Sequence, residues 1–84
     1  MRERDEAINR GEAAAFLRAV RGALGLSQTE FAKMLGASRR TLWSAEEGGD
    51  ESLRAVAEEK LRIMIAIAAE KAPAFIVRPA WVQK

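Results

Sequence analysis

The sequence predicts a small all-α domain of four to five helices with a short C-terminal extended arm or strand. Its 84 residues are expected to form one domain, 1–84, and they include no cysteine or histidine. Apolar residues recur at helical spacing over most of the first 71 residues. Serine, asparagine or aspartate stands before each expected helix, and glycine or proline follows it. Together these observations predict separate helices and a distinct tail.

The first expected helix spans residues 9–24. Asn9 suits the N-cap position, and Glu12 supplies the acid of a reciprocal capping pair three residues later. Gly25 offers the positive φ at which helices often end. Arg18 falls largely outside the apolar face. That face consists of Ala13, Leu17, Val20 and Leu24.

A second, shorter helix is expected over residues 28–35. Ser27 and Glu30 have the spacing of a capping box, in which each side chain bonds the backbone N–H of the other residue. Gly36 ends the helix and allows the positive φ that a tight turn requires.

The third helix is expected over residues 39–47, with Ser38 at its N-cap. Leu42 and Ala45 should face the core. Trp43 lies between these two inward positions, so we expect its ring to point outward.

The fourth helix is expected over residues 51–71, with Asp50 as its cap and Pro73 as its stop. A break near residues 58–60 remains an alternative. The second half, residues 61–69, is apolar on nearly every side. This run is too short to span a membrane, which takes about 20 apolar residues.

The tail, residues 74–84, contains the strand-like run Phe75, Ile76 and Val77. A helix that is apolar on all sides needs cover on all sides, and a short chain supplies few neighbours. We therefore expect a homodimer in which helix 51–71 and the tail form the dimer or partner surface. Its expected residues are Ile63, Met64, Ile67, Phe75, Val77 and Trp81. The alternative is a monomer whose own tail covers the outer face of the helix.

The segment GLSQTEFAKMLGASRRTLWSAEEG, residues 25–48, has the spacing of a helix-turn-helix over residues 28–47. Its residue order resembles the lambda-repressor/Cro-like, or XRE-type, regulators, which typically read Gly-Leu-Ser-Gln, Leu-Ala, Gly, Ser-Arg, an aliphatic residue and Glu-x-Gly. The resemblance covers about residues 16–56. The matching residues are Gly25, Leu26, Ser27, Gln28, Phe31, Ala32, Gly36, Ser38, Arg39, Leu42, Glu46, Glu47 and Gly48.

This resemblance implies a lambda-repressor-like DNA-binding domain. Gln28 matches a position that contacts phosphate, and Ser38 and Thr41 match positions that touch the sugar-phosphate backbone. Arg21 and Glu46 match a structural salt bridge between the first and third helices. The positions that reach base edges correspond to Arg39, Arg40 and Ser44.

The chemistry of the residues agrees with these implied roles. An arginine fork suits the O6/N7 edge of guanine, and two arginines at a helix start also suit phosphates. Trp43 stands where the family commonly has a polar residue. It could contact a thymine methyl group or a sugar, or it could pack on a partner or on the tail. Basic residues and a proline common after the third helix in relatives are replaced here by Gly49, Asp50, Glu51 and Ser52, which predicts fewer phosphate contacts from this loop.

Other function classes find little support in the sequence. Without histidine or cysteine the chain cannot build a histidine general base or a Cys/His zinc site. We expect no enzyme activity, no cofactor and no metal, and we interpret the acidic cluster at residues 46–51 as capping and solvated charge. Net charge is +2, which permits nucleic acid binding without requiring it. A cytoplasmic location is expected.

Two hypotheses follow for function. In the first, the chain is a dimeric regulator, of the phage-repressor or antitoxin type, that binds a pseudo-palindromic operator in double-stranded DNA. In the second, it is an adaptor or antitoxin that binds a protein partner, such as a toxin, mainly through its apolar helix and tail.

Overall fold

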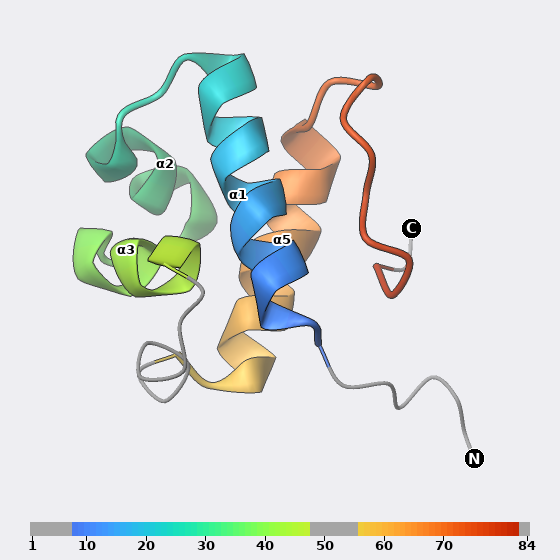
Figure 1. Cartoon of the computed structure of the whole chain (residues 1–84). Helices are drawn as coiled ribbons and strands as arrows, with labels where there is room; N and C mark the ends of the chain where they lie inside the picture. Colours follow the sequence, from blue (N-terminus) through green and yellow to red (C-terminus); the bar gives the residue numbers. More distant parts are fainter. Residues whose placement is uncertain (1–7, 48–55, 83–84) are drawn as a thin grey trace.

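A computed structural model describes residues 8–47 and 56–82 of the chain. Four helices lie within these residues, and no strand does. The expected all-α fold is confirmed. The helices are α1 (Arg10–Leu24), α2 (Gln28–Leu35), α3 (Arg39–Glu47) and α5 (Glu58–Lys71). Figure 1 shows α1 standing between the α2–α3 pair on one side and α5 with the C-terminal tail on the other.

The predicted N-caps of the first three helices are present. Asn9 accepts a hydrogen bond from the Glu12 backbone N–H at 2.9 Å. Ser27 and Glu30 form the full capping box, with bonds of 3.1 and 2.9 Å. The Ser38 hydroxyl accepts from the backbone N–H of Thr41 at 3.0 Å. Local polar spacing therefore fixes where these helices begin.

Two of the four helices, α1 and α2, end on a glycine in the left-handed region. Gly25 follows α1 with φ 69°, and Gly36 follows α2 with φ 72°. A side chain at either position would be strained, because L-residues rarely adopt this conformation. The glycines turn the chain sharply, so that α2 packs against α3 and α3 packs against α1.

The core lies where α1, α2, α3 and α5 meet. Aliphatic and aromatic side chains at helical spacing supply it, as the sequence predicts. The largest of them are almost fully inaccessible to solvent. These are Leu17, Val20, Phe31, Leu35, Leu42, Val56, Leu61, Met64 and Ile65.

The predicted helix 51–71 is interrupted at residues 56–57, close to the break near residues 58–60 that the sequence left as an alternative. Helix α5 begins at Glu58, after an extended N-cap at Ala57 that makes no side-chain capping bond. Just before it, the Val56 side chain is buried and the Val56 carbonyl accepts from Arg10 at 2.8 Å. This long-range anchor holds the chain outside the helix at Val56. Asp50, the expected cap, and residues 51–55 lie outside the described residues.

The C-terminal arm docks on its own domain. Pro79 is buried, and Ile76, Trp81 and Val82 pack against the core. The Trp81 indole donates to Glu12 of α1 at 3.0 Å, and Arg78 donates to the Ala69 carbonyl of α5 at 3.0 Å. The tail therefore covers part of α1 and α5 of its own chain. It is held by turns, not as a strand.

Docking of the tail also redirects Glu12. The sequence predicts that Glu12 completes a reciprocal capping pair with Asn9. Its carboxylate instead accepts the hydrogen bond from Trp81.

No helix among the described residues is long and apolar enough to cross a membrane.

Candidate nucleic-acid interface

Helices α2 and α3 form a helix-turn-helix. Phe31 and Leu35 of α2 and Leu42 of α3 are buried, so the two helices are packed together through the core. The turn between them is anchored from outside, because Lys60 of α5 donates to the Gly36 carbonyl at 3.1 Å. The packed core and this turn together hold one side of α3 toward solvent.

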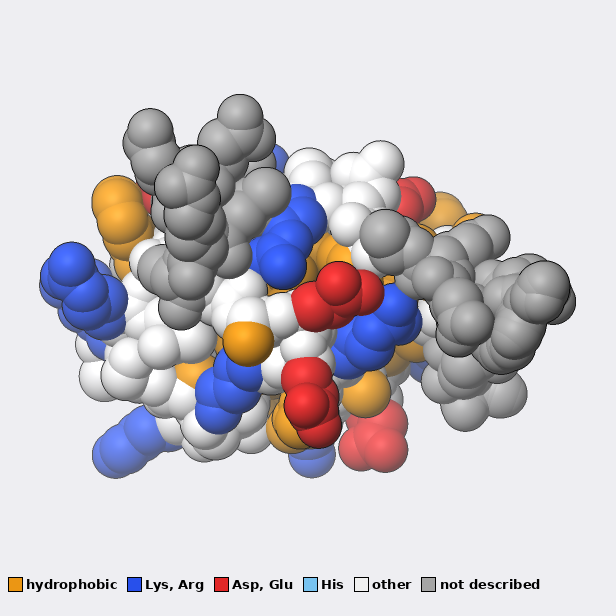
Figure 2. Space-filling model, turned by 90° about the horizontal axis from the view of Figure 1, so that it is seen from below, with side chains coloured by type: hydrophobic (Ala, Val, Ile, Leu, Met, Phe, Trp, Pro, Cys, Tyr) orange, Lys and Arg blue, Asp and Glu red, His pale blue; other side chains and the backbone are white. Residues whose placement is uncertain are grey.

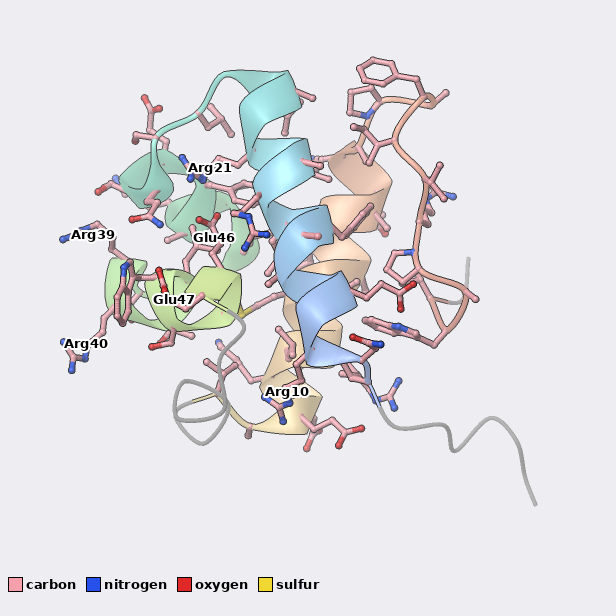
Figure 3. The ribbon with its side chains drawn as sticks, viewed as in Figure 1. Arg10, Arg21, Arg39, Arg40, Glu46 and Glu47 are labelled. Atoms are coloured by element: carbon pink, nitrogen blue, oxygen red, sulfur yellow. The ribbon has the colours of Figure 1, made fainter. Side chains whose placement is uncertain are left out.

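The exposed side of α3 carries Arg39, Arg40, Trp43 and Glu47. In Figure 3 the labelled Arg39 and Arg40 point away from the body of the domain. Figure 2 shows basic side chains projecting at the left edge, the side on which Figure 1 places α2 and α3. Trp43 is 46% exposed, as expected for a ring that points outward. This surface therefore combines two arginine cations with one large apolar ring.

The opposite side of α3 is buried and includes Leu42 and Ala45, which were both predicted to face inward. Ser44 is also buried, at 7% exposure. This corrects the expectation that Ser44 reaches a base edge, because a hydroxyl covered by its own domain is not available to DNA. The side chains of α3 that solvent or a ligand can reach are those on its exposed side.

Glu46 links three helices through one buried carboxylate. Its exposure is 4%, and Arg21 of α1 forms two hydrogen bonds to it, from Nε at 2.8 Å and from Nη2 at 3.1 Å. Gln28 of α2 donates to the same carboxylate at 2.9 Å. Figure 3 shows the Arg21 and Glu46 side chains directed toward one another. The predicted salt bridge is present, and it fixes the end of α3 against α1 and α2.

Arg18 is a positioning residue that the sequence analysis missed. Its guanidinium donates to the backbone carbonyl of Glu46, near the end of α3. A cation is favourable there because the last carbonyls of a helix carry partial negative charge. Arg18 lies three residues before Arg21 and so shares its side of α1, but this spacing does not indicate that its partner is the Glu46 carbonyl.

The remaining polar residues of the motif are engaged at the helix starts. The Ser38 hydroxyl donates to the Thr41 hydroxyl at 2.9 Å while it caps α3. Gln28 gives one N–H of its amide to Glu46, and an amide carries a second one. Glu30 titrates unusually, because the Ser27 backbone N–H and then the Ser27 hydroxyl hold the pKa of its carboxyl below the ordinary value of 4.5.

The comparisons with known proteins agree with this arrangement. A family model described as the antitoxin Xre-like helix-turn-helix domain matches residues 3–63, which is more than half of the chain. The chain belongs to the Xre-like helix-turn-helix family. No curated protein and no solved structure matches it significantly. Membership places the chain in a class of DNA-binding regulators and antitoxins, and the proteins of such a class are typically not enzymes.

The predicted partner surface of this Xre-like domain is only partly available. Phe75, Val77 and Ile63 are exposed, at 77%, 87% and 50%. Ile67 and Trp81 are half-buried in their own chain. Met64 is fully buried, which corrects its assignment to the surface: it fills the core between the helices and cannot meet a partner.

The acidic cluster at residues 46–51 divides in a similar way. Glu46 is the buried ion-pair partner described above, and Glu47 is exposed at the end of α3. Residues 48–55 lie outside the described residues, and they include Gly49, Asp50, Glu51 and Ser52, from which fewer phosphate contacts were expected.

Proposed function

We propose that this Xre-like domain is a sequence-specific regulator of transcription that binds double-stranded DNA as a dimer and represses its own promoter. The observation that carries the proposal is the division of α3 into two sides. One side is fixed to α1 and α2 through Glu46, and the other presents Arg39, Arg40 and Trp43 to solvent. A helix held in this way can enter the major groove without reordering its own domain.

The side chains on the exposed face suit a readout of base edges. A guanidinium donates two parallel hydrogen bonds to guanine O6 and N7, and each good bidentate contact is worth about 1–3 kcal/mol of discrimination. Ser38, Thr41 and the second N–H of Gln28 lie at the starts of α3 and α2, where helix N-termini favour phosphate. We assign them backbone contacts that set the register of the helix on the duplex.

The dimer would place two copies of α3 on one side of the duplex. In proteins of this geometry the half-sites lie about 34–36 Å apart, which is one helical turn. The exposed Ile63, Phe75 and Val77 are the candidates for contact between protomers. A pseudo-palindromic operator near the gene, occupied by the dimer, would obstruct polymerase. This function belongs in the cytoplasm.

The test measures affinity for duplex DNA with and without the two arginines. The Arg39→Ala/Arg40→Ala variant should lose binding while its circular dichroism and melting curve stay close to wild type. For the wild type, log affinity should fall linearly with log salt, at a slope of about −0.9 per phosphate neutralised. Lys71→Ala, at the far end of α5, is the matched control and should bind normally. Unchanged binding by the arginine variant, or a flat salt response, would contradict the proposal.

A second candidate function rests on the tail. Phe75 and Val77 are exposed beside an open groove of about 340 Å³, which is lined by α1 and by residues 75–79. Contiguous exposed apolar patches often mark a protein-binding surface. As an adaptor or antitoxin, the chain would bind a partner such as a toxin there. Truncation after Pro73 would then abolish function, whereas the arginine variant would keep it.

A further inference from the structure

The exposed side of α3 holds a hollow of about 330 Å³, which is lined by Arg39, Arg40 and Trp43 alone. The Trp43 ring is 46% exposed there. Within the described residues, the other large exposed apolar side chains lie on α5 and the tail, not on α3. The hollow therefore has one apolar wall and two cationic walls, on the helix that faces DNA in the proposed function.

The major groove offers one apolar group at its base edges. This group is the C5 methyl of a pyrimidine, which in unmodified DNA belongs to thymine, whereas the other groups there are hydrogen-bond donors and acceptors. Guanine O6 and N7 are the acceptors that suit an arginine fork. A hollow with an apolar wall between two arginines therefore matches a thymine beside a guanine.

We propose that Trp43 is a specificity-determining residue, whose ring and the adjoining arginine stems receive the C5 methyl group of a thymine next to a guanine bound by Arg39 or Arg40. This inference rests on the proposed DNA-binding function. The contact is favourable because it removes apolar surface of both the indole and the methyl group from water. The long side chains of Arg39 and Arg40 contribute their methylene stems to the same contact.

The experiment removes the methyl group and nothing else. Purified protein first selects a duplex from randomised DNA, and each thymine of that duplex is then replaced by deoxyuridine, which pairs with adenine in the same way. For the wild type, we expect that deoxyuridine at one particular thymine of a half-site weakens binding about fourfold. This factor corresponds to the free energy of burying one methyl group. Replacement in both half-sites should weaken binding by about fifteenfold.

The protein variants assign the effect to Trp43. Trp43→Ala should bind the thymine and deoxyuridine duplexes equally, with an affinity ratio near one. Trp43→Gln takes its place if the alanine variant does not fold, as judged by circular dichroism. The matched control is Trp81→Phe, which alters the other tryptophan, in the tail, and should keep the wild-type ratio.

The possible outcomes distinguish a failure of this inference from a failure of the proposed DNA-binding function. If the wild type binds its selected duplex and no thymine replacement weakens binding, the inference is wrong and the DNA-binding function stands. The inference is also wrong if the Trp43 variants keep the thymine preference, because another residue then reads the methyl group. If folded wild-type protein selects no sequence, both the inference and the proposed function fail.

Discussion

At the scale of single residues, Glu46 shows how one side chain sets the geometry of the candidate interface. It receives hydrogen bonds from α1 and α2 although it belongs to α3. A carboxylate at 4% exposure is costly unless it is paired. The ion pair therefore holds α3 in one orientation against α1 and α2, and we expect the loss of either partner to destabilise the domain itself.

Arg21→Ala should lower the free energy of unfolding by about 3 kcal/mol, near the lower end of the range for breaking a buried pair, because Glu46 would be left buried with its charge. The expectation is not higher because the Arg21 side chain keeps 27% exposure. Urea unfolding measures the loss. The same substitution at the exposed Arg40 should change stability by less than about 0.5 kcal/mol. Equal losses at the two positions would contradict the structural role of the pair.

At the scale of elements, helix ends are the part of this fold that local sequence determines. The caps at Asn9, Ser27 and Ser38 and the stop at Gly36 were all predictable, because each depends on residues within one turn. The bond from Arg18 to the end of α3 and the bond from Trp81 to Glu12 were not. Both bonds join residues that are far apart in the chain, so the local spacing of residues does not predict them. The interruption of the predicted helix at Val56 likewise depends on a distant residue, because the Val56 carbonyl accepts from Arg10.

Gly22 within α1 and Gly25 at its C-cap should respond to alanine in opposite directions. Gly22 lies within the helix with open space around it, so Gly22→Ala should stabilise the domain by about 0.5–1 kcal/mol. Gly25 has open space too, but its φ is +69°. Gly25→Ala should therefore destabilise by about 1 kcal/mol, through backbone strain alone. Thermal melts of the two variants measure both effects, and changes of the same sign would refute the assigned C-cap.

The start of α2 should weaken in acid. Because Ser27 holds the pKa of Glu30 below its ordinary value of 4.5, ionised Glu30 stabilises the fold above that pH, and the contribution disappears as pH falls through the lower, folded-state pKa. Glu30→Gln keeps a capping group without the titration. The stability difference between wild type and this variant should shrink as pH falls below about 4.5. A difference that stays constant between neutral and acid pH would contradict the capping box.

At the scale of the whole molecule, the tail completes the domain. The sequence indicated that the apolar α5 needs a second cover, and it left open whether that cover comes from a partner or from the chain itself. The chain itself supplies this cover, through Pro79, Trp81 and Val82. This choice depends on where α1 places Glu12 relative to Trp81, which no composition or periodicity reveals. Phe75 and Val77 stay exposed, and the proposed contact with a second copy or a protein partner would use them.

Truncation after Pro73 should lower the free energy of unfolding by about 2 kcal/mol, because it exposes apolar surface on α1 and α5 that the tail covers, offset by the freedom of the removed residues. Chemical unfolding at several protein concentrations measures this loss. The concentration series also separates it from dimer dissociation, since a dimer gains stability as concentration rises. A truncated chain as stable as the full chain would mean that the tail is not docked.

The central claim is that the exposed side of α3 reads the sequence of duplex DNA. Parallel selections from one pool of randomised duplexes, with wild-type protein and with the Arg39→Ala/Arg40→Ala variant, test it most directly. We expect the wild type to enrich a pseudo-palindrome with half-sites about one helical turn apart, and the folded variant to enrich none. Enrichment of the same sequence by both proteins, or no enrichment by folded wild type, would contradict the claim.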